Sequence, residues 1–135
     1  MKKLVFCGVA ALLLVLTIVS VYAAPTDYFY LETVCSDPNS PFCDLQNADP
    51  FTGLNEGQIE YLTCACPDKW LCEVVLTTAN GDGMVYGRVR LVRDHGYFTL
   101  RLGEGSLAGL HAIGRIDWLE GDKISLEGTY RLDPP

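Results

Sequence analysis

Five cysteines carry the chemistry that is easiest to interpret in this sequence: Cys35, Cys43, Cys64, Cys66 and Cys72. In an oxidising compartment they would form two disulfides and leave one thiol over, either free or in a disulfide-linked dimer. A bond between Cys64 and Cys66 would be badly strained, but spacing does not choose among the remaining pairings. The pairing that we expect joins Cys35 and Cys43 to two of the other three, which would tie the N-terminal segment onto the rest of the fold.

A metal site is the alternative for the same cysteines. Cys64, Cys66 and Cys72 lack the usual gap of two residues between zinc ligands, and thiolates in a secreted chain tend to oxidise. Residues 80–83, Asn-Gly-Asp-Gly, offer oxygen ligands but lack the first acidic position and the closing glutamate of a calcium loop. We therefore expect disulfides and a tight turn, and the sequence predicts no metal and no cofactor.

Catalytic residues are hard to identify. The histidines are His95 and His111. His95 is expected in a hairpin turn, and His111 has no identifiable partner that would make it a nucleophile or a metal site. Ser106 does not lie in the Gly-x-Ser-x-Gly turn of the hydrolases. His111 could line the mouth of a barrel, and His111 and Asp117 are the only candidates for an isomerase or cyclase reaction. The sequence therefore predicts no catalytic residue.

The N-terminus has the pattern of a secretory signal peptide. Lys2 and Lys3 precede a segment from Leu4 to Val21 without charge, and the small residues that follow suit cleavage after Ala23. An uncleaved membrane anchor is the alternative, because this segment approaches the roughly 20 residues of a membrane helix. Pro25 favours cleavage, so we expect a single secreted domain of residues 24–135 with no membrane partner.

The charge balance narrows the range of partners. The formal net charge of −7 becomes −9 once Lys2 and Lys3 leave with the signal peptide. Residues 24–82 hold ten acidic residues against Lys69, whereas residues 83–135 balance seven against seven. Nucleic acids bind to basic surfaces, so a nucleic acid is not an expected partner. The acidic half is either an ordinary solvated surface or a docking site for a cationic partner.

Alternating apolar and polar residues predict β-strands in the C-terminal half. Five strands are expected at about residues 71–78, 84–93, 97–102, 110–118 and 123–132, with turns at 80–83, 94–96 and 120–122 and a glycine-rich corner at 103–110. Gly96 is expected in the left-handed conformation of a hairpin loop. Such an up-and-down antiparallel meander closes into a small barrel, which removes exposed sheet edges. Residues 28–34 supply a further strand that could close it.

Residues 24–70 are expected to form an acidic, cysteine-rich loop region. Prolines and Asx residues between positions 36 and 50 indicate an irregular loop that a disulfide would have to hold in place. Asn55 could cap a short helix from Glu56 to about Cys64. The predicted fold class is thus all-β, a small antiparallel up-and-down barrel with a disulfide-linked N-terminal loop region and one short helix.

The same alternation predicts which side chains line the barrel. Those expected to face inward and contact a ligand are Arg88, Phe98, Leu100, His111, Ile116, Trp118, Leu126 and Tyr130. Leu102 and Leu132 are expected on the same inward faces, and Ser125 is expected to face water. Small eight-stranded barrels are either filled by their own side chains or hold one small ligand.

Several short motifs resemble a known family. They are Gly103-Glu104-Gly105-Ser106-Leu107-Ala108-Gly109-Leu110, Arg115-Ile116-Asp117, Gly121-Asp122 and Glu127-Gly128-Thr129-Tyr130. Together they resemble the C-terminal half of the allene oxide cyclase-like barrels, most closely a mostly bacterial branch of unknown function, with the plant dirigent proteins as more distant relatives. Ala112 stands where that family tends to have glycine. The resemblance covers about residues 84–132 and implies an apolar barrel of about eight strands, and it transfers no catalytic residue.

Three functions are compatible with these patterns. The first is a secreted, non-catalytic barrel that binds a small hydrophobic or aromatic molecule, with the acidic half as a lid or docking surface. The second is a cysteine-rich interaction protein, of venom, defence or effector type, that engages a protein target on a host or cell surface. The third is an isomerase or cyclase that acts on a lipid-like substrate. The first is the function that we predict.

Overall fold

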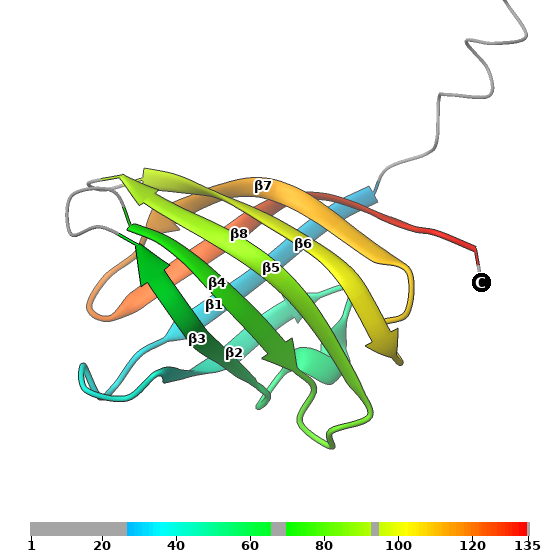
Figure 1. Ribbon diagram of the computed structural model, residues 1–135, viewed down its shortest axis with the longest axis horizontal. Helices are drawn as coiled ribbons and strands as arrows, with labels where there is room; N and C mark the ends of the chain where they lie inside the picture. The colour runs from blue at the N-terminus through cyan, green and yellow to red at the C-terminus, as the bar shows by residue number, and fades with distance from the viewer. Residues whose placement is uncertain (1–26, 66–69, 93–94, 135) are drawn as a thin grey trace, which may run out of the picture.

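The chain forms a closed β-barrel. The computed structural model describes residues 27–65, 70–92 and 95–134, and the predicted signal peptide and Cys66 lie outside these ranges. The strands are β1 (Asp27–Val34), β2 (Phe42–Asp49), β3 (Gln58–Ala65), β4 (Trp70–Thr77), β5 (Gly83–Val92), β6 (His95–Gly105), β7 (Leu110–Trp118) and β8 (Lys123–Leu132). Each strand pairs antiparallel with the next, and β1 pairs with β8 to close the barrel (Figure 1). The all-β, up-and-down antiparallel barrel is therefore confirmed.

The N-terminal half is part of the barrel wall. Besides the expected first strand, it contributes β2 and β3, which lie in the region expected to be a loop. The helix expected from Glu56 to Cys64 is wrong, because residues 58–65 form β3 and Ile59 is fully buried on its inward face. Asn55 does not cap that helix, since its side-chain oxygen accepts a hydrogen bond from the Ala48 N–H at 2.8 Å. The acidic half is consequently not a separate lid.

The core lies inside the barrel, between strands on all sides. Alternate side chains point inward, and those from opposite walls meet, as Phe29 of β1 and Phe98 of β6 do with ring centroids 5.7 Å apart. The largest fully buried side chains of the strands are Phe29, Leu31, Leu45, Ile59, Val74, Leu76, Val85, Leu100, Leu110, Ile116 and Leu126. Burying each of these large side chains contributes roughly 1.5–3 kcal/mol relative to leaving it in water. The middle of the barrel is therefore a packed hydrophobic core.

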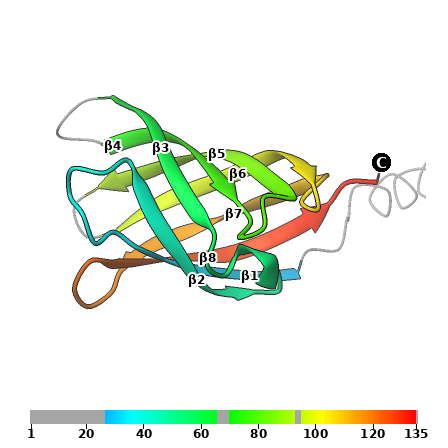
Figure 2. The same ribbon diagram turned by 90° about the horizontal axis from the view of Figure 1, so that it is seen from below.

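One end of the barrel is plugged by its own side chains. A short 3-10 helix, η1 (Thr52–Leu54), follows β2 at the end where β1 begins and β8 finishes (Figure 2). Leu54 is fully buried there, and the ring of Phe51 packs edge-on against Tyr130 with centroids 4.8 Å apart. Phe51 also contacts Phe29, so the plug is continuous with the core.

Four details of the predicted strands are wrong. Leu102 is 66% exposed and has a positive φ, because the β5–β6 register shifts beside it. Leu132 is 55% exposed although its register partner Leu110 is fully buried, because Leu132 is the last residue of β8. Ser125 faces outward as expected but is buried, since Glu32 and Asp117 flank it on the neighbouring strands. Gly96 lies within β6 and is not left-handed.

The turn between β4 and β5 is fixed by a carboxylate. The hydroxyl groups of Thr78 and Ser106 donate hydrogen bonds to Asp82 Oδ1 at 2.8 and 2.9 Å. These bonds, that from Thr78 most of all, hold the pKa of Asp82 below its ordinary value of 3.8. Asp82 thereby links this turn to the one that follows β6.

Replacing Asp82 with asparagine is expected to destabilise the barrel in a pH-dependent way. A carboxyl whose pKa is lowered by folding stabilises the folded state above its unfolded pKa, and this contribution is lost as the pH falls through the folded pKa. Asp82→Asn should therefore lower the melting temperature at pH 7, and the difference from the wild type should shrink as the pH falls below about 3.8. Thermal unfolding at pH 7, 4 and 2.5 measures this. A difference that is the same at all three values would contradict it.

Candidate functional site

The two disulfides lie at the end of the barrel opposite η1. Cys35 at the end of β1 is bonded to Cys43 in β2, and Cys64 in β3 is bonded to its register partner Cys72 in β4. The expected pairing of Cys35 and Cys43 with the later cysteines is wrong. Adjacent antiparallel strands joined by a short connection bring the flanking Cα atoms to 4.5 and 4.1 Å, within reach of a disulfide. Each bridge therefore staples one hairpin.

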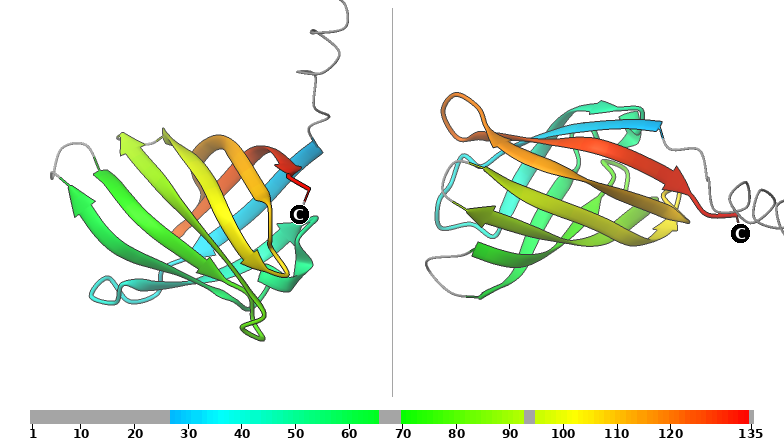
Figure 3. Two further views of the ribbon diagram at one scale, coloured as in Figure 1. Left: turned by 45° about the vertical axis from the view of Figure 1, so that its right-hand side comes forward. Right: turned by 90° about the horizontal axis from the view of Figure 1, so that it is seen from above.

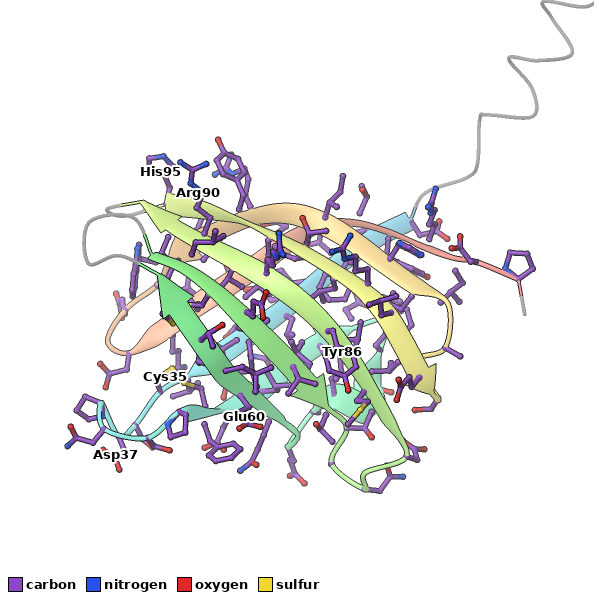
Figure 4. The ribbon with its side chains drawn as sticks, viewed as in Figure 1. Cys35, Asp37, Glu60, Tyr86, Arg90 and His95 are labelled. Carbon is purple, nitrogen blue, oxygen red and sulfur yellow. A yellow bond between two sulfur atoms is a disulfide. The ribbon has the colours of Figure 1, made fainter. Side chains whose placement is uncertain are left out.

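The connection between β1 and β2 is held in place as the sequence suggested. Residues 36–41 form it, and the Cys35–Cys43 bond closes it. Asp37 Oδ1 accepts a hydrogen bond from the Asn39 N–H at 2.9 Å, and Ser40 Oγ accepts one from the Phe42 N–H at 3.1 Å. Cys35 donates its N–H to the carbonyl of Asp122, which ties the connection to the β7–β8 turn. Figure 4 shows Cys35 and Asp37 together at this end.

A pocket of about 500 Å³ opens at this end of the barrel. Its walls come from the β1–β2 and β7–β8 connections and from the ends of β3, β4 and β5, which Figure 3 shows gathered on one side. Both disulfides line it, together with Tyr61, Leu91, Trp118 and Ile124, and Pro38 and Pro41 form part of its rim. This size and the mainly apolar, aromatic and sulfur-containing walls are typical of sites for small organic molecules.

Trp118 and Tyr61 give the pocket two aromatic walls. Trp118 pairs in register with Ile124 across the β7–β8 turn, and its side chain is 46% exposed. Tyr61 is mostly buried against the core, and this burial raises the pKa of its hydroxyl group. The phenol is therefore neutral at physiological pH and can donate a hydrogen bond.

A buried hydroxyl group lies beneath these walls. Thr33 is fully buried on the inward face of β1, where its register partner on β8 is the pocket residue Ile124. The Thr33 hydroxyl group lies close enough to the Tyr61 hydroxyl group to lower the Tyr61 pKa, which offsets part of the rise caused by burial. The two groups do not form a hydrogen bond of good geometry. Within the described residues Thr33 Oγ1 has no hydrogen-bond partner. Thr33 is not among the residues that line the pocket, so Tyr61 supplies the hydroxyl group that a ligand would meet there.

The charged residues of the pocket are acidic. Asp37 and Asp122 line it, and among its described lining residues there is no lysine, arginine or histidine. The two come from different connections, which the hydrogen bond from Cys35 to Asp122 holds together. A molecule bound in the apolar part of the pocket would meet negative charge at the rim.

Similarity to known proteins gives no further information on the fold or on the pocket. No protein-family model, curated protein or solved structure matches the chain. The resemblance to the allene oxide cyclase-like barrels therefore stays a prediction.

The structure separates the residues that we expected to line one ligand site. Trp118 lines the pocket. The expected lining residues that lie in the packed core below it are Phe98, Leu100, Ile116 and Leu126. Tyr130 lies at the opposite end, against Phe51. Half of the residues that were expected to line a ligand site therefore lie in the packed core.

Two of the expected lining residues lie outside the barrel. The Arg88 guanidinium is exposed and lies 3.6 Å from the carboxylate of Glu73 on the neighbouring strand. His111 Nε2 lies 2.7 Å from Asp133 Oδ2, on the outward face of β7. Both positions follow from the alternation, since their chain neighbours on each side, such as Val89 and Ala112, point inward.

The pocket contains residues that the sequence did not single out. Tyr61 was assigned to a helix, and Asp37, Pro38 and Pro41 to an irregular loop. A signal for Tyr61 was present, because Ile59 and Tyr61 alternate with Glu60 and Leu62 in the period of a strand.

The candidate catalytic residues lie away from the pocket. Asp117 points outward from β7 and accepts hydrogen bonds from Arg115 at 3.1 and 3.2 Å, and His111 pairs with Asp133 near the other end of the same strand. In residues 27–65, 70–92 and 95–134, no group of three or more His, Cys, Asp or Glu side chains could hold a metal ion. No helix in these ranges is long and apolar enough to cross a membrane.

Proposed function

We propose that this protein is a secreted barrel that binds a small, largely apolar or aromatic molecule. The observation that carries the proposal is the pocket of about 500 Å³ at the disulfide end, with its walls of aromatic, aliphatic and disulfide groups. Pockets of roughly 300–1,000 Å³ with apolar walls and a few polar groups are typical of small-molecule sites. Tyr61 and Asp122 supply such polar groups here.

The ligand enters the end of the barrel and does not displace its centre. The inward side chains of the middle layers are buried in one contiguous cluster, and opening it would cost the free energy of that burial. The opposite end is filled by Phe51, Leu54 and Tyr130. At the disulfide end, the side chain of Trp118 lines the pocket and remains partly exposed.

An extracellular location fits the covalent chemistry. The two disulfides persist in oxidising compartments and are rare in the cytosol. Both line the pocket, so the same bonds that suit secretion also hold the proposed site in shape. The predicted signal peptide supports the same location.

Titration with N-phenyl-1-naphthylamine, an uncharged probe that fluoresces in apolar sites, tests the proposal. We expect saturable binding to the wild type and roughly tenfold weaker binding to Trp118→Ala, because a large aromatic wall of a binding site commonly contributes more than 1 kcal/mol. The matched control is Tyr97→Ala, since Tyr97 is 58% exposed on β6 and does not line the pocket. Absence of saturable binding, or equal effects of the two substitutions, would refute the site.

A further inference from the structure

We infer that the ligand is a cationic amphiphile, with an apolar body in the pocket and a protonated amine at its rim. This inference rests on the proposed function and adds the charge and the polar groups of the ligand. It is carried by the combination of apolar walls, two carboxylates and the hydroxyl group of Tyr61 in one pocket.

The rim selects for positive charge. Asp37 and Asp122 lie on connections that the Cys35–Asp122 backbone hydrogen bond joins, and no cationic side chain lies among the described lining residues. One oxygen of Asp37 already accepts the Asn39 N–H, and Asp122 lines the same pocket. An ammonium group at the rim would gain from both charges, and a carboxylate group would be repelled by both.

Trp118 strengthens the same preference. Its partly exposed ring lines the pocket together with the two carboxylates. The face of an indole ring attracts cations and is the best of the aromatic side chains in this respect. An amine that lies between Trp118 and Asp122 would therefore be favoured over an uncharged group of the same size.

The hydroxyl group of Tyr61 adds a second requirement that is independent of the rim. Tyr61 lines the pocket, whereas Thr33, whose hydroxyl group lies near that of Tyr61, is fully buried and is not one of the lining residues. The Tyr61 hydroxyl group is neutral, since burial raises its pKa. A ligand with an uncharged hydroxyl or carbonyl group at its inner end would accept a hydrogen bond from the Tyr61 hydroxyl group.

A series of ten-carbon molecules tests the charge preference by displacement of bound N-phenyl-1-naphthylamine. Decylamine, decan-1-ol and decanoate share one apolar body and differ in charge. We expect decylamine to bind roughly tenfold tighter than decan-1-ol, and decanoate to bind at least tenfold more weakly than decan-1-ol. In Asp37→Asn/Asp122→Asn the three affinities should converge, while that for decan-1-ol stays unchanged. Glu104→Gln, whose site lies beyond the pocket, is the control for net charge.

The inner hydroxyl is tested with 10-aminodecan-1-ol. It should bind at least threefold tighter than decylamine to the wild type, and Tyr61→Phe should remove that difference without changing the affinity for decylamine. Equal binding of all the ten-carbon molecules to the wild type would overturn the inference and leave the proposed function intact. Failure of every molecule and of the fluorescent probe to bind would overturn both.

Discussion

Replacing Gly128 with alanine is expected to prevent the barrel from closing in its present form. Gly114 of β7 and Gly128 of β8 are register partners, and their backbones approach so closely that there is no room for a side chain. A Cβ atom on Gly128 would lie 2.6 Å from Gly114 Cα and closer still to the carbonyl oxygen of Ile113. These are backbone atoms of the strand ladder, so they cannot move aside as a flexible side chain could. We expect a destabilisation above about 3 kcal/mol, among the larger effects of single substitutions.

Denaturant unfolding followed by circular dichroism measures this loss. The matched control is Gly53→Ala in η1, where the nearest atom to an added Cβ is Thr78 Cγ2 at 3.8 Å, an ordinary contact. The control should unfold within about 1 kcal/mol of the wild type. If Gly128→Ala unfolds at the same denaturant concentration as this control, the close approach of β7 and β8 does not limit the fold.

The sequence predicted the strands whose side chains alternate without interruption. In β4 the inward Cys72, Val74 and Leu76 are buried, and in β8 the last long run places Ile124 and Leu126 in the core. Such alternation is a local property, so it can be read without knowing the partner strands. Half of the residues predicted to line a ligand site are core residues for the same reason. The alternation predicts that a side chain points into the barrel, but it does not distinguish a side chain that contacts a ligand from one that packs in the core.

The missed strand β2 shows why the N-terminal half was assigned to a loop. It has Cys43, Leu45 and Ala48 as its buried residues, so the spacing changes from two to three along the strand. Asn47 between them has a positive φ of 52°, and the β1–β2 register shifts near this point. A bulge of this kind breaks the period of two that marks a strand. Polar residues such as Asp44 and Gln46 then give the segment the composition of a loop.

The pocket was not predictable because its walls come from the connections between strands and from the closure of the barrel. Asp37 and Asp122 are far apart in the chain, and they share a rim because β1 pairs with β8 to complete the barrel. The alternation of apolar and polar residues predicts which face of a strand is buried, but it does not predict which end of the barrel stays open. The disulfide pairing failed for a related reason. Once residues 58–65 are recognised as a strand next to β4, Cys64 and Cys72 fall opposite each other across a hairpin.

Removal of both disulfides is expected to destabilise the protein by about 5 kcal/mol. Each closes a short loop with a sequence separation of 8. Loop-closure entropy for this length corresponds to about 2.5 kcal/mol for each bond. A single domain typically has only 5–15 kcal/mol of stability, so the reduced protein would be close to unfolding. Paired alanine substitutions, at positions 35 and 43 or at 64 and 72, should each show about half of the total loss in denaturant unfolding.

The same substitutions separate stability from binding. Both bonds line the pocket, so each pair of substitutions should also weaken the binding of N-phenyl-1-naphthylamine at least tenfold under conditions where the protein remains folded. Cys66→Ala is the control, since Cys66 belongs to neither of these bonds. It should change neither the unfolding free energy nor the affinity for the probe. If the paired variants lose stability but bind the probe as the wild type does, the disulfides serve the barrel alone and the ligand lies elsewhere. If binding weakens with the loss of either bond, the walls of the pocket depend on both hairpins, since both disulfides line it.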